Sequence, residues 1–533
     1  GLVAAPAVSA DVPPTADPNI SKWSSQATPT EKDLVILPGS DIIGMAVGGE
    51  DGEIIYAIGV WYDQCEEDVW ADDVYGPNDI HEYQHPKLWK SVDGGVTWKD
   101  ITDDVLDADN LPVLAASPVA GEFDWEDFTF FSNVAISPDD PDFVVVAGWG
   151  YDSTAAPPYV PIVVGTDNAG SDWEYMGSSG QIDGLVSALD VSPSMGGTPD
   201  VAVGTFAVTE NPGPPSLADI DMTNGAAAVY LFDAGKFSSS WVEASAWGTE
   251  FAPADFVTDL KFSPNYDIDD TLVALTVGWV DPDSYTSTPN PGEDYRGYKV
   301  QMATTGSIKD WNADADFGSA YPMLVTHDGS IVVAPQDDDL LASAPTGYDS
   351  IVMRGEAFRR AGHLALPHDF TGYNGADRRV MVAVNGFQFN PATYAATPDL
   401  GEELSEGGYM FWLMNNKWAP EELLQHESNP YIASIAYHGN VNMMGKTMVG
   451  LQFPQDWGYE DIAAWAADPA ENSIPVCNGV QVLRSETLDV CCPVWQSACK
   501  PPSGQFMATV AYTPDGELGY AVTQGESRMY AVD

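Results

Sequence analysis

A strand–turn–strand pattern recurs along the chain and constrains its fold more than any other feature of the sequence. Each copy has a short alternating apolar run, a turn rich in Pro, Asp and Gly, and a second apolar run; the clearest extends from Leu260 through Pro264 to Leu275. Alternation with a period of two is typical of half-buried β-strands, and the turn residues predict antiparallel pairing. Seven copies are clear, and they begin at Ile43, Val134, Leu189, Leu260, Leu364, Ile435 and Val510.

One interval between copies is long enough to hold another repeat. Leu260 and Leu364 are separated by about twice the shortest spacing between copies. The interval contains Leu324–Gly329 followed by Ile331–Ala334, a pairing that is similar to the last copy. We interpret it as an eighth repeat, and an inserted hairpin is the alternative.

A second pattern, Ser-x-Asp-x-Gly-x-x-Trp, follows most of these strand pairs. It is complete once and is repeated once with conservative changes; the two copies are Ser91, Asp93, Gly95 and Trp98, and Thr166, Asn168, Gly170 and Trp173. Degenerate copies end at Trp241, Trp311, Trp418 and Trp495. This pattern resembles the Asp-box, or BNR, repeat of β-propellers.

The residue types of this pattern suit a tight turn between two strands. Hydroxyl and carboxylate side chains can accept hydrogen bonds from the backbone amides of a turn. Glycine tolerates the positive φ angle that such a turn requires. The tryptophan then lies on the sheet surface, where it can pack against a neighbouring sheet.

The resemblance implies an all-β fold, a single β-propeller of four-stranded blades that follows the seven clear repeats and the eighth. Four-stranded sheets bury both faces by stacking in a ring. The chain stops at Met529–Val532, which reads as a third strand, and Leu34–Leu37 can supply the fourth, so we expect the N-terminal strand to close the ring. We assign 33–533 to the propeller, 11–32 to a Pro/Ser/Thr-rich strap and 1–10 to the end of a secretory signal peptide.

The charge of the chain excludes some classes of partner. Asp plus Glu is 80 and Lys plus Arg is 20, which gives a net charge of −60. Such a field repels phosphate backbones and anionic lipid surfaces, so we exclude nucleic-acid binding. The sequence has no apolar run long enough for a transmembrane helix. With the signal-like start, these features favour a secreted or cell-surface protein.

Long insertions rich in acidic and aromatic residues interrupt the repeats. We expect them to form one acidic, aromatic surface, because loops of one kind emerge on one face of a propeller. They lie at 61–86, 104–128, 208–226, 280–297, 386–407 and 454–475. Tryptophans that could act as binding platforms there are Trp61, Trp70, Trp125, Trp279 and Trp457.

An enzymatic role has little support from individual residues, and we assign no catalytic residue. Asp-box sialidases are similar to one another in an early arginine motif, but Arg296 is the first arginine of this chain and Arg-Ile-Pro does not occur. A glycosidase needs only two suitably spaced carboxylates. With 80 acidic residues the sequence cannot select such a pair.

Several acidic segments are candidate cation sites, because hard carboxylate oxygens suit Ca²⁺. Each could equally be an ordinary acidic turn. The candidate ligands are Asp63, Glu66, Glu67, Asp68, Asp72, Asp73, Asp267, Asp269, Asp314 and Asp316. We expect Ca²⁺ as a possible ligand and no organic cofactor.

Cysteines and arginines form two further clusters. In an exported chain, Cys477, Cys491, Cys492 and Cys499 would form two local disulfides of undetermined pairing, and Cys65 would be left over. Reduced buried thiols are the alternative. An anion-binding or docking patch is one interpretation of Arg354, Arg359, Arg360, Arg378 and Arg379, and local charge balance is the other.

Together these features favour a non-catalytic extracellular structural or assembly protein. Acidic, repeat-built exported chains with Asp boxes resemble surface-layer or matrix proteins, in which a rigid propeller acts as a tile. Self-association or contacts with other surface proteins or glycans would use the inserted loops, with divalent cations bridging acidic edges. The alternatives are a carbohydrate-active enzyme with an axial site and a glycan- or protein-binding propeller.

Overall fold

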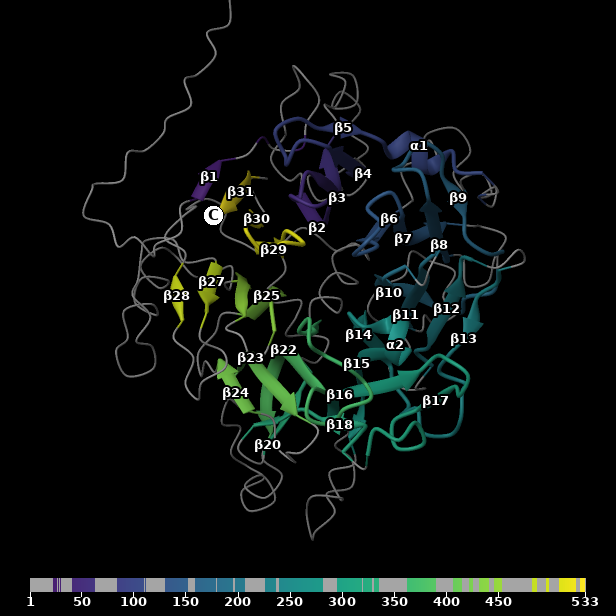
Figure 1. Ribbon diagram of the computed structural model, residues 1–533, viewed down its shortest axis with the longest axis vertical. Coiled ribbons are helices and arrows are strands. Elements are labelled where there is room, and N and C mark those ends of the chain that lie inside the picture. The colour runs from purple at the N-terminus through teal and green to yellow at the C-terminus, as the bar shows by residue number, and fades with distance from the viewer. Residues whose placement is uncertain are drawn as a thin grey trace, which may run out of the picture.

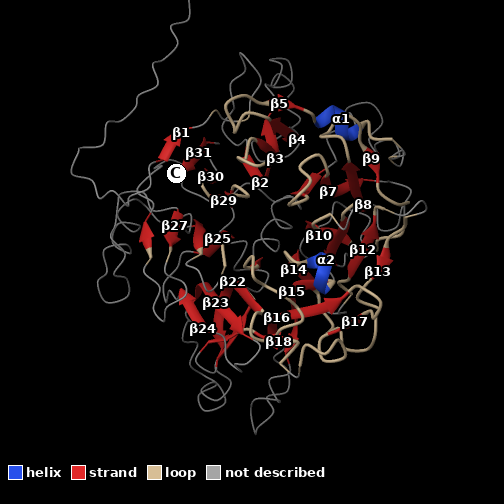
Figure 2. Ribbon diagram, in the orientation of Figure 1, coloured by secondary structure: helices blue, strands red, loops and turns tan. Residues whose placement is uncertain are grey.

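The structure is a computed structural model. It describes residues 23–25, 27, 29, 41–62, 84–109, 111, 130–151, 159–178, 180–194, 197–206, 226–235, 239–280, 295–318, 320–327, 330–334, 362–389, 406–414, 421–424, 431–440, 445–452, 482–486, 495–497, 508–523 and 528–532. Strands dominate this part of the chain (Figure 2).

The described strands pair antiparallel in four separate four-stranded sheets and one 15-stranded sheet. We divide the 15-stranded sheet into three groups of four and the strands β18, β19 and β20, which gives seven groups of four in the described residues. We number them blades 1 to 7. Blade 1 is β2 (Asp41–Gly48), β3 (Ile54–Tyr62), β4 (Gln84–Ser91) and β5 (Lys99–Asp100); blade 2 is β6 (Phe130–Ile136), β7 (Val144–Tyr151), β8 (Tyr159–Thr166) and β9 (Glu174–Tyr175). Blade 3 is β10 (Leu185–Val191), β11 (Asp200–Phe206), β12 (Val229–Asp233) and β13 (Val242–Glu243). Blade 4 is β14 (Phe256–Phe262), β15 (Thr271–Val280), β16 (Tyr295–Thr304) and β17 (Asp310–Trp311).

The remaining blades follow the same order. Blade 5 is β21 (Gly362–Ala365), β22 (Arg379–Phe389), β23 (Glu406–Met414) and β24 (Glu421–Leu424). Blade 6 is β25 (Tyr431–His438), β26 (Lys446–Gln452), β27 (Val482–Ser485) and β28 (Gln496–Ser497). Blade 7 is β29 (Ala508–Tyr512), β30 (Gly519–Thr523), β31 (Arg528–Val532) and β1 (Trp23–Ser25). The two short helices in the described residues are α1 (Thr102–Leu106) and α2 (Tyr266–Asp269).

The blades are arranged around a central axis (Figure 1). The first strand of each blade contacts the first strand of the next, in the order β2, β6, β10, β14, β21, β25 and β29, and β29 contacts β2. Aromatic side chains pack between neighbouring blades: the Phe206 ring lies 5.0 Å from that of Phe256 and 5.9 Å from that of Trp149. The chain is therefore an all-β propeller, as the repeats predict.

The last blade contains strands from both ends of the chain. β1 pairs with β31 in antiparallel register, with Trp23 opposite Val532 and Ser25 opposite Tyr530. The fourth strand of this sheet is therefore N-terminal, but it comes from the segment that we assigned to the strap. Leu34–Leu37, which we expected in this position, lies outside the described residues.

The segment interpreted as an eighth repeat contains a hairpin in its described part. β19 (Thr326–His327) pairs with β20 (Ser330–Val333), and the preceding strand β18 (Met323–Leu324) pairs with β16. β20 also pairs with both β16 and β22. The described residues of this segment thus pair with strands of both blade 4 and blade 5.

The Ser-Pro pairs of the repeat end the first strand of a blade. At four of these turns a buried hydroxyl residue donates its backbone N–H to a carbonyl across the turn, at 2.9 to 3.0 Å. The donor and acceptor pairs are Ser137 and Phe143, Ser192 and Asp200, Ser263 and Thr271, and Thr513 and Leu518. A proline directly after the donor suits this position, because proline has no N–H of its own to satisfy.

The alternation of strand direction gives the propeller two different faces. Turns between strands one and two, and between three and four, lie on one face, which we call the turn face. The other connections lie on the opposite, insertion face. All six predicted insertions leave and re-enter the described sheets on the insertion face, and most of their residues lie outside the described chain. Among the described residues no helix is long and apolar enough to cross a membrane.

Candidate functional site

The complete Ser-x-Asp-x-Gly-x-x-Trp pattern forms a turn on the turn face of blade 1 and has the expected hydrogen bonds. The Ser91 hydroxyl accepts from the Gly95 N–H at 2.9 Å and donates to Asp93 Oδ1 at 2.9 Å. Asp93 accepts from the Thr97 N–H at 2.8 Å and from its hydroxyl at 2.6 Å. These bonds, first those from Thr97, hold the pKa of Asp93 below its ordinary value. Gly94 and Gly95 both have positive φ angles.

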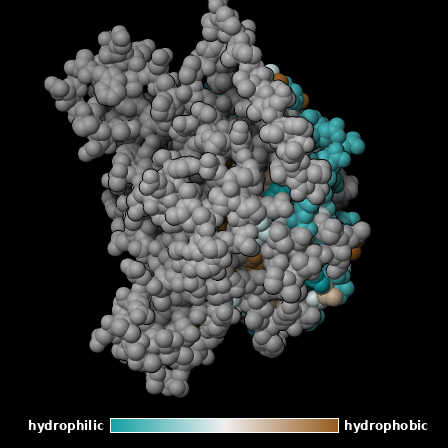
Figure 3. Space-filling view, turned by 90° about the vertical axis from the view of Figure 1, so that its left-hand side faces the viewer, coloured by the Kyte–Doolittle hydropathy of each residue, from teal (hydrophilic) through white to brown (hydrophobic). Residues whose placement is uncertain are grey.

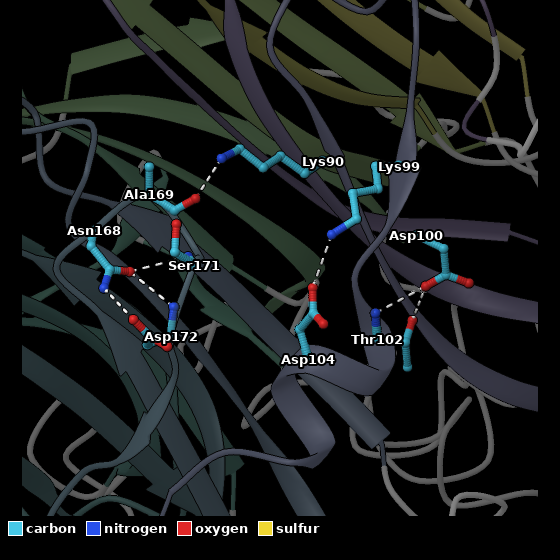
Figure 4. Close-up of polar contacts among 9 residues, drawn as sticks. All are labelled: Lys90, Lys99, Asp100, Thr102, Asp104, Asn168, Ala169, Ser171 and Asp172. Carbon is cyan, nitrogen blue, oxygen red and sulfur yellow. Dashed lines mark hydrogen bonds and ion pairs between the residues drawn. The ribbon is translucent and has the colours of Figure 1, made fainter.

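The conservative copy in blade 2 uses an amide for the same purpose (Figure 4). The Thr166 hydroxyl accepts from the Gly170 N–H at 3.1 Å. Asn168 Oδ1 accepts from the N–H groups of Ser171 and Asp172, at 3.1 and 3.0 Å. The side chains of both boxes are therefore occupied by the turns that they stabilise, and they have a structural role.

The tryptophans that end these patterns connect neighbouring blades. In four cases the indole N–H donates to a backbone carbonyl in or just after the fourth strand of the preceding blade, at 2.7 to 2.9 Å. The pairs are Trp98 and Ala27, Trp241 and Met176, Trp311 and Ala244, and Trp495 and Leu423. Among the described residues Trp173 has no such acceptor, and Trp418 lies outside them.

A partly buried lysine joins the first two blades on the turn face. Lys90 donates to the carbonyl of Ala169 in the blade 2 box (Figure 4), and its ammonium lies 5.5 Å from the centre of the Tyr56 ring. Burial lowers the pKa of Lys90, and the Asp142 carboxylate opposes this shift. On the outer side of the same contact, Lys99 pairs with Asp104 at 3.1 Å.

Turn-to-turn contacts continue around the turn face. Asp139 contacts Ser194 between blades 2 and 3, and Asn265 contacts Phe370 between blades 4 and 5. His368 contacts His438 between blades 5 and 6, and His438 contacts Pro514 between blades 6 and 7. The two histidine rings meet edge to face, 4.5 Å apart. Burial and the nearby His438 lower the pKa of His368. The turns of these neighbouring blades are thus linked on the turn face.

The described candidate cation ligands do not converge on a common point. Asp269 is buried and accepts from the Ser263 hydroxyl at 2.8 Å and from the Gly372 N–H at 2.7 Å. Asp267, Asp314 and Asp316 are exposed on turns of blade 4. No group of three or more metal-ligating side chains suited to an ion occurs in the described part of the chain. The other candidates lie outside it: Asp63, Glu66, Glu67, Asp68, Asp72 and Asp73.

The arginine cluster is only partly described, and Arg378 has an internal role. Its guanidinium donates to the carbonyls of Gly372 at 2.6 Å and Phe317 at 2.7 Å, and it lies over the Phe317 ring. This buried side chain therefore does not present its charge to a partner. Arg379 is half-buried at the start of β22. Arg354, Arg359, Arg360 and the cysteines Cys65, Cys477, Cys491, Cys492 and Cys499 lie outside the described residues.

Two groups of charged side chains near the axis are internally paired. Lys261 lies between Asp190 and Asp259, with Nζ to carboxylate distances of 3.4 and 3.6 Å. Burial raises the pKa of Asp190, and the Lys261 ammonium opposes the shift. At the insertion-face end of β14, the fully buried carboxylate of Asp255 accepts from Arg296 Nε at 3.1 Å. Both groups bind blades or strands together.

Exposed apolar side chains gather on the turn face. Six large hydrophobic side chains are exposed among the described residues, and five project from turns of this face: Val92, Val96, Ile268, Ile308 and Tyr373. Val242, on the outer strand β13, is the sixth. Most of the described surface visible in Figure 3 is hydrophilic, with a few apolar side chains in it. Because five of the six exposed apolar side chains project from one face, the turn face is the candidate surface for contact with another protein.

Sequence patterns did not identify these apolar residues. Their signal is a large apolar side chain inside a turn where the repeat requires none, such as Ile268 between Asp267 and Asp269. The repeat pattern assigns apolar residues to strands, so it does not predict exposed apolar side chains in turns.

Comparisons with known proteins show similarity in fold alone. No protein-family model matches the chain, and no curated protein is significantly similar to it. YCF48 from Cyanidioschyzon merolae is 10% identical, with a TM-score of 0.44, over 96% of this chain and 98% of that one. The GH93 α-L-arabinofuranosidase of Fusarium graminearum, in complex with arabinobiose, is 9% identical, with a TM-score of 0.35, over 96% and 98%. Hydrazine synthase of Kuenenia stuttgartiensis is 11% identical, with a TM-score of 0.41, over 94% and 96%. Similarity at this level carries no argument about function.

Proposed function

We propose that this chain is a non-catalytic, Asp-box-type propeller that acts extracellularly as a structural or assembly protein, in the manner of a surface-layer or matrix tile. The observation that carries the proposal is the exposure of large apolar side chains on the turn face, at blade 1 and at blades 4 and 5. Burying such groups against another protein is favourable by about 25 cal/mol per Å² of apolar area.

The described polar groups support a structural role. Asp93, Asp139 and Asp269 accept hydrogen bonds from backbone amides or hydroxyls of the turns, and Asp255 is paired with an arginine. Their lone pairs are used inside the fold, where they make the turn face rigid. A rigid surface loses little conformational entropy when it contacts a partner.

The net charge of −60 adds a requirement for counterions. Neighbouring copies would repel one another at low ionic strength, because charges interact over about 10 Å at 0.1 M salt. Divalent cations that bridge acidic edges, with Ca²⁺ the candidate, would remove this repulsion. Inserted loops, including 61–86, would supply further contacts.

Electron microscopy and sedimentation velocity of the purified protein, with and without millimolar Ca²⁺, test the proposal. We expect ordered assemblies that dissolve on chelation. A Val92→Ser/Val96→Ser variant should assemble less well, since both side chains are exposed and leave the fold intact when replaced. Dispersed single particles in every condition, at all protein concentrations, would contradict the proposal.

A further inference from the structure

Three of the exposed apolar side chains project from neighbouring turns of blades 4 and 5. Ile268, Ile308 and Tyr373 have 62%, 66% and 67% of their surfaces exposed. They come from three different turns: α2, which is blue in Figure 2, the turn between β16 and β17, and the turn between β21 and β22. We call these three residues the blade 4–5 patch.

Hydrogen bonds hold the three turns of this patch together. The Thr305 N–H donates to the carbonyl of Asp270 at 2.8 Å, which joins the turn of Ile308 to the end of α2. The Gly372 N–H, next to Tyr373, donates to the buried carboxylate of Asp269 at 2.7 Å. The apolar side chains therefore stand on a fixed platform.

The charge around the patch is negative. Asp267 is exposed beside Ile268, and the half-buried Asp270 has its carboxylate against Gly306, in the turn that carries Ile308. The nearby basic groups are turned to other contacts: the Lys309 ammonium lies 4.6 Å from the centre of the Trp247 ring, and the Arg378 guanidinium is directed inward. The patch thus combines apolar contact area with a rim of carboxylates.

We propose that the blade 4–5 patch binds a basic polypeptide segment that carries aliphatic or aromatic side chains. This inference rests on the proposed role of the turn face in contacting other proteins, and it names the chemistry of one partner. Apolar side chains of the segment would cover Ile268, Ile308 and Tyr373, while its lysines or arginines would face Asp267 and Asp270. A second copy of the chain, with its net charge of −60, lacks this complementarity.

Fluorescence anisotropy with labelled synthetic peptides tests the inference. The probe is a short peptide of alternating lysine and leucine, and the controls alternate lysine with serine or glutamate with leucine. The full chain is compared with a patch variant, Ile268→Ser/Ile308→Ser/Tyr373→Ser, and with the matched variant Val92→Ser/Val96→Ser on blade 1 of the same face. An Asp267→Asn/Asp270→Asn variant tests the carboxylate rim separately.

We expect the lysine–leucine peptide to bind the full chain more tightly than either control peptide. The patch variant should bind it at least about tenfold more weakly, and the blade 1 variant within about twofold of the full chain. Neutralising the rim should weaken binding and reduce its dependence on salt. Equal binding of the lysine–serine peptide, or an unchanged affinity in the patch variant, would overturn the inference.

The outcome is separable from that of the assembly experiment. Particles that stay dispersed with and without Ca²⁺, together with patch-dependent peptide binding, would contradict the tile and support the patch. Ordered assemblies that dissolve on chelation, without patch-dependent peptide binding, would support the tile and contradict the proposal for the patch. Unchanged melting temperatures of both serine variants exclude misfolding as the cause of a loss.

Discussion

The indole N–H of Trp98 donates a hydrogen bond to the carbonyl of Ala27, 71 residues earlier in the sequence and 2.8 Å away in space. Ala27 follows β1, the strand that completes blade 7. The bond therefore joins blade 7 to blade 1 at the place where the two ends of the propeller meet. It has the same form as the bonds of Trp241, Trp311 and Trp495 between other neighbouring blades.

Replacing these tryptophans should reveal the energy of the indole bonds. Trp311 is fully buried and donates to Ala244, whereas Trp173 is buried without an acceptor among the described residues. Both substitutions with phenylalanine lose ring volume, but Trp311→Phe also removes one of the two hydrogen bonds that the Ala244 carbonyl accepts, the other of which comes from the Trp247 N–H. We expect Trp311→Phe to cost about 1–2 kcal/mol more than Trp173→Phe in denaturant unfolding. Equal costs would show that the bond is dispensable.

The Asp93 box should contribute to the acid sensitivity of the fold. Its folded pKa is depressed, so its contribution is present above the unfolded pKa, about 3.9, and is lost as the pH falls through the folded pKa. Asp93→Asn should retain the turn at neutral pH, because Asn168 accepts the corresponding bonds in blade 2. It should also make the melting temperature less dependent on pH below about 4.

Asp93→Ala separates the acceptor from its charge. Alanine offers the Thr97 groups no acceptor, so this variant should be less stable than Asp93→Asn at neutral pH. Thermal melts of the three proteins from neutral to acidic pH make the comparison. Identical behaviour of the two variants at neutral pH would argue against a structural role for the side-chain acceptor.

Arg378 should behave as a core residue and not as part of a docking patch. Arg378→Gln removes the donors to Gly372 and Phe317 and leaves these carbonyls unsatisfied in a buried site. We expect a loss of about 3 kcal/mol in unfolding free energy, against less than about 0.5 kcal/mol for the half-buried neighbour Arg379→Gln. A stable Arg378→Gln protein would contradict this role.

Lys261 should contribute to the stability of the fold, because its ammonium lies beside two carboxylates. Lys261→Met leaves Asp190 and Asp259 close together without a cation, and about a third of the Lys261 side chain is exposed, so solvent reduces the effect. We expect a loss of about 1–2 kcal/mol at neutral pH. Adding Asp190→Asn should restore part of it, and a double-mutant cycle in denaturant measures the coupling. Strictly additive losses would count against the ion triad.

Local sequence patterns predicted the all-β propeller fold, but they did not predict the contacts between blades. The Ser-Pro turns and the box around Asp93 depend on neighbours within a few residues, so their chemistry is visible in the sequence. The acceptor of Trp98 and the carbonyl partners of Arg378 belong to distant segments, and no spacing rule identifies them. Trp23–Ser25 also carries a weak strand signal, which is why Leu34–Leu37 seemed the better closing strand.

The exposure of the side chains in the blade 4–5 patch could not be predicted from the sequence for a different reason. Ile268 and Ile308 lie in polar turns, and sequence periodicity cannot say whether such side chains fold inward or stay in solvent. Their exposure depends on how α2 packs over β14 and β15, which is a property of the assembled blade.

The pairing of β1 with β31 also sets an order of events during synthesis. A ribosome makes β1 long before β31, so this strand has no partner until nearly the whole described chain has been produced. Until then the final sheet lacks its outer strand and the indole of Trp98 lacks its acceptor. Cooperative closure of the ring is therefore a late step, completed only when β1 and β31 are both present and free to pair.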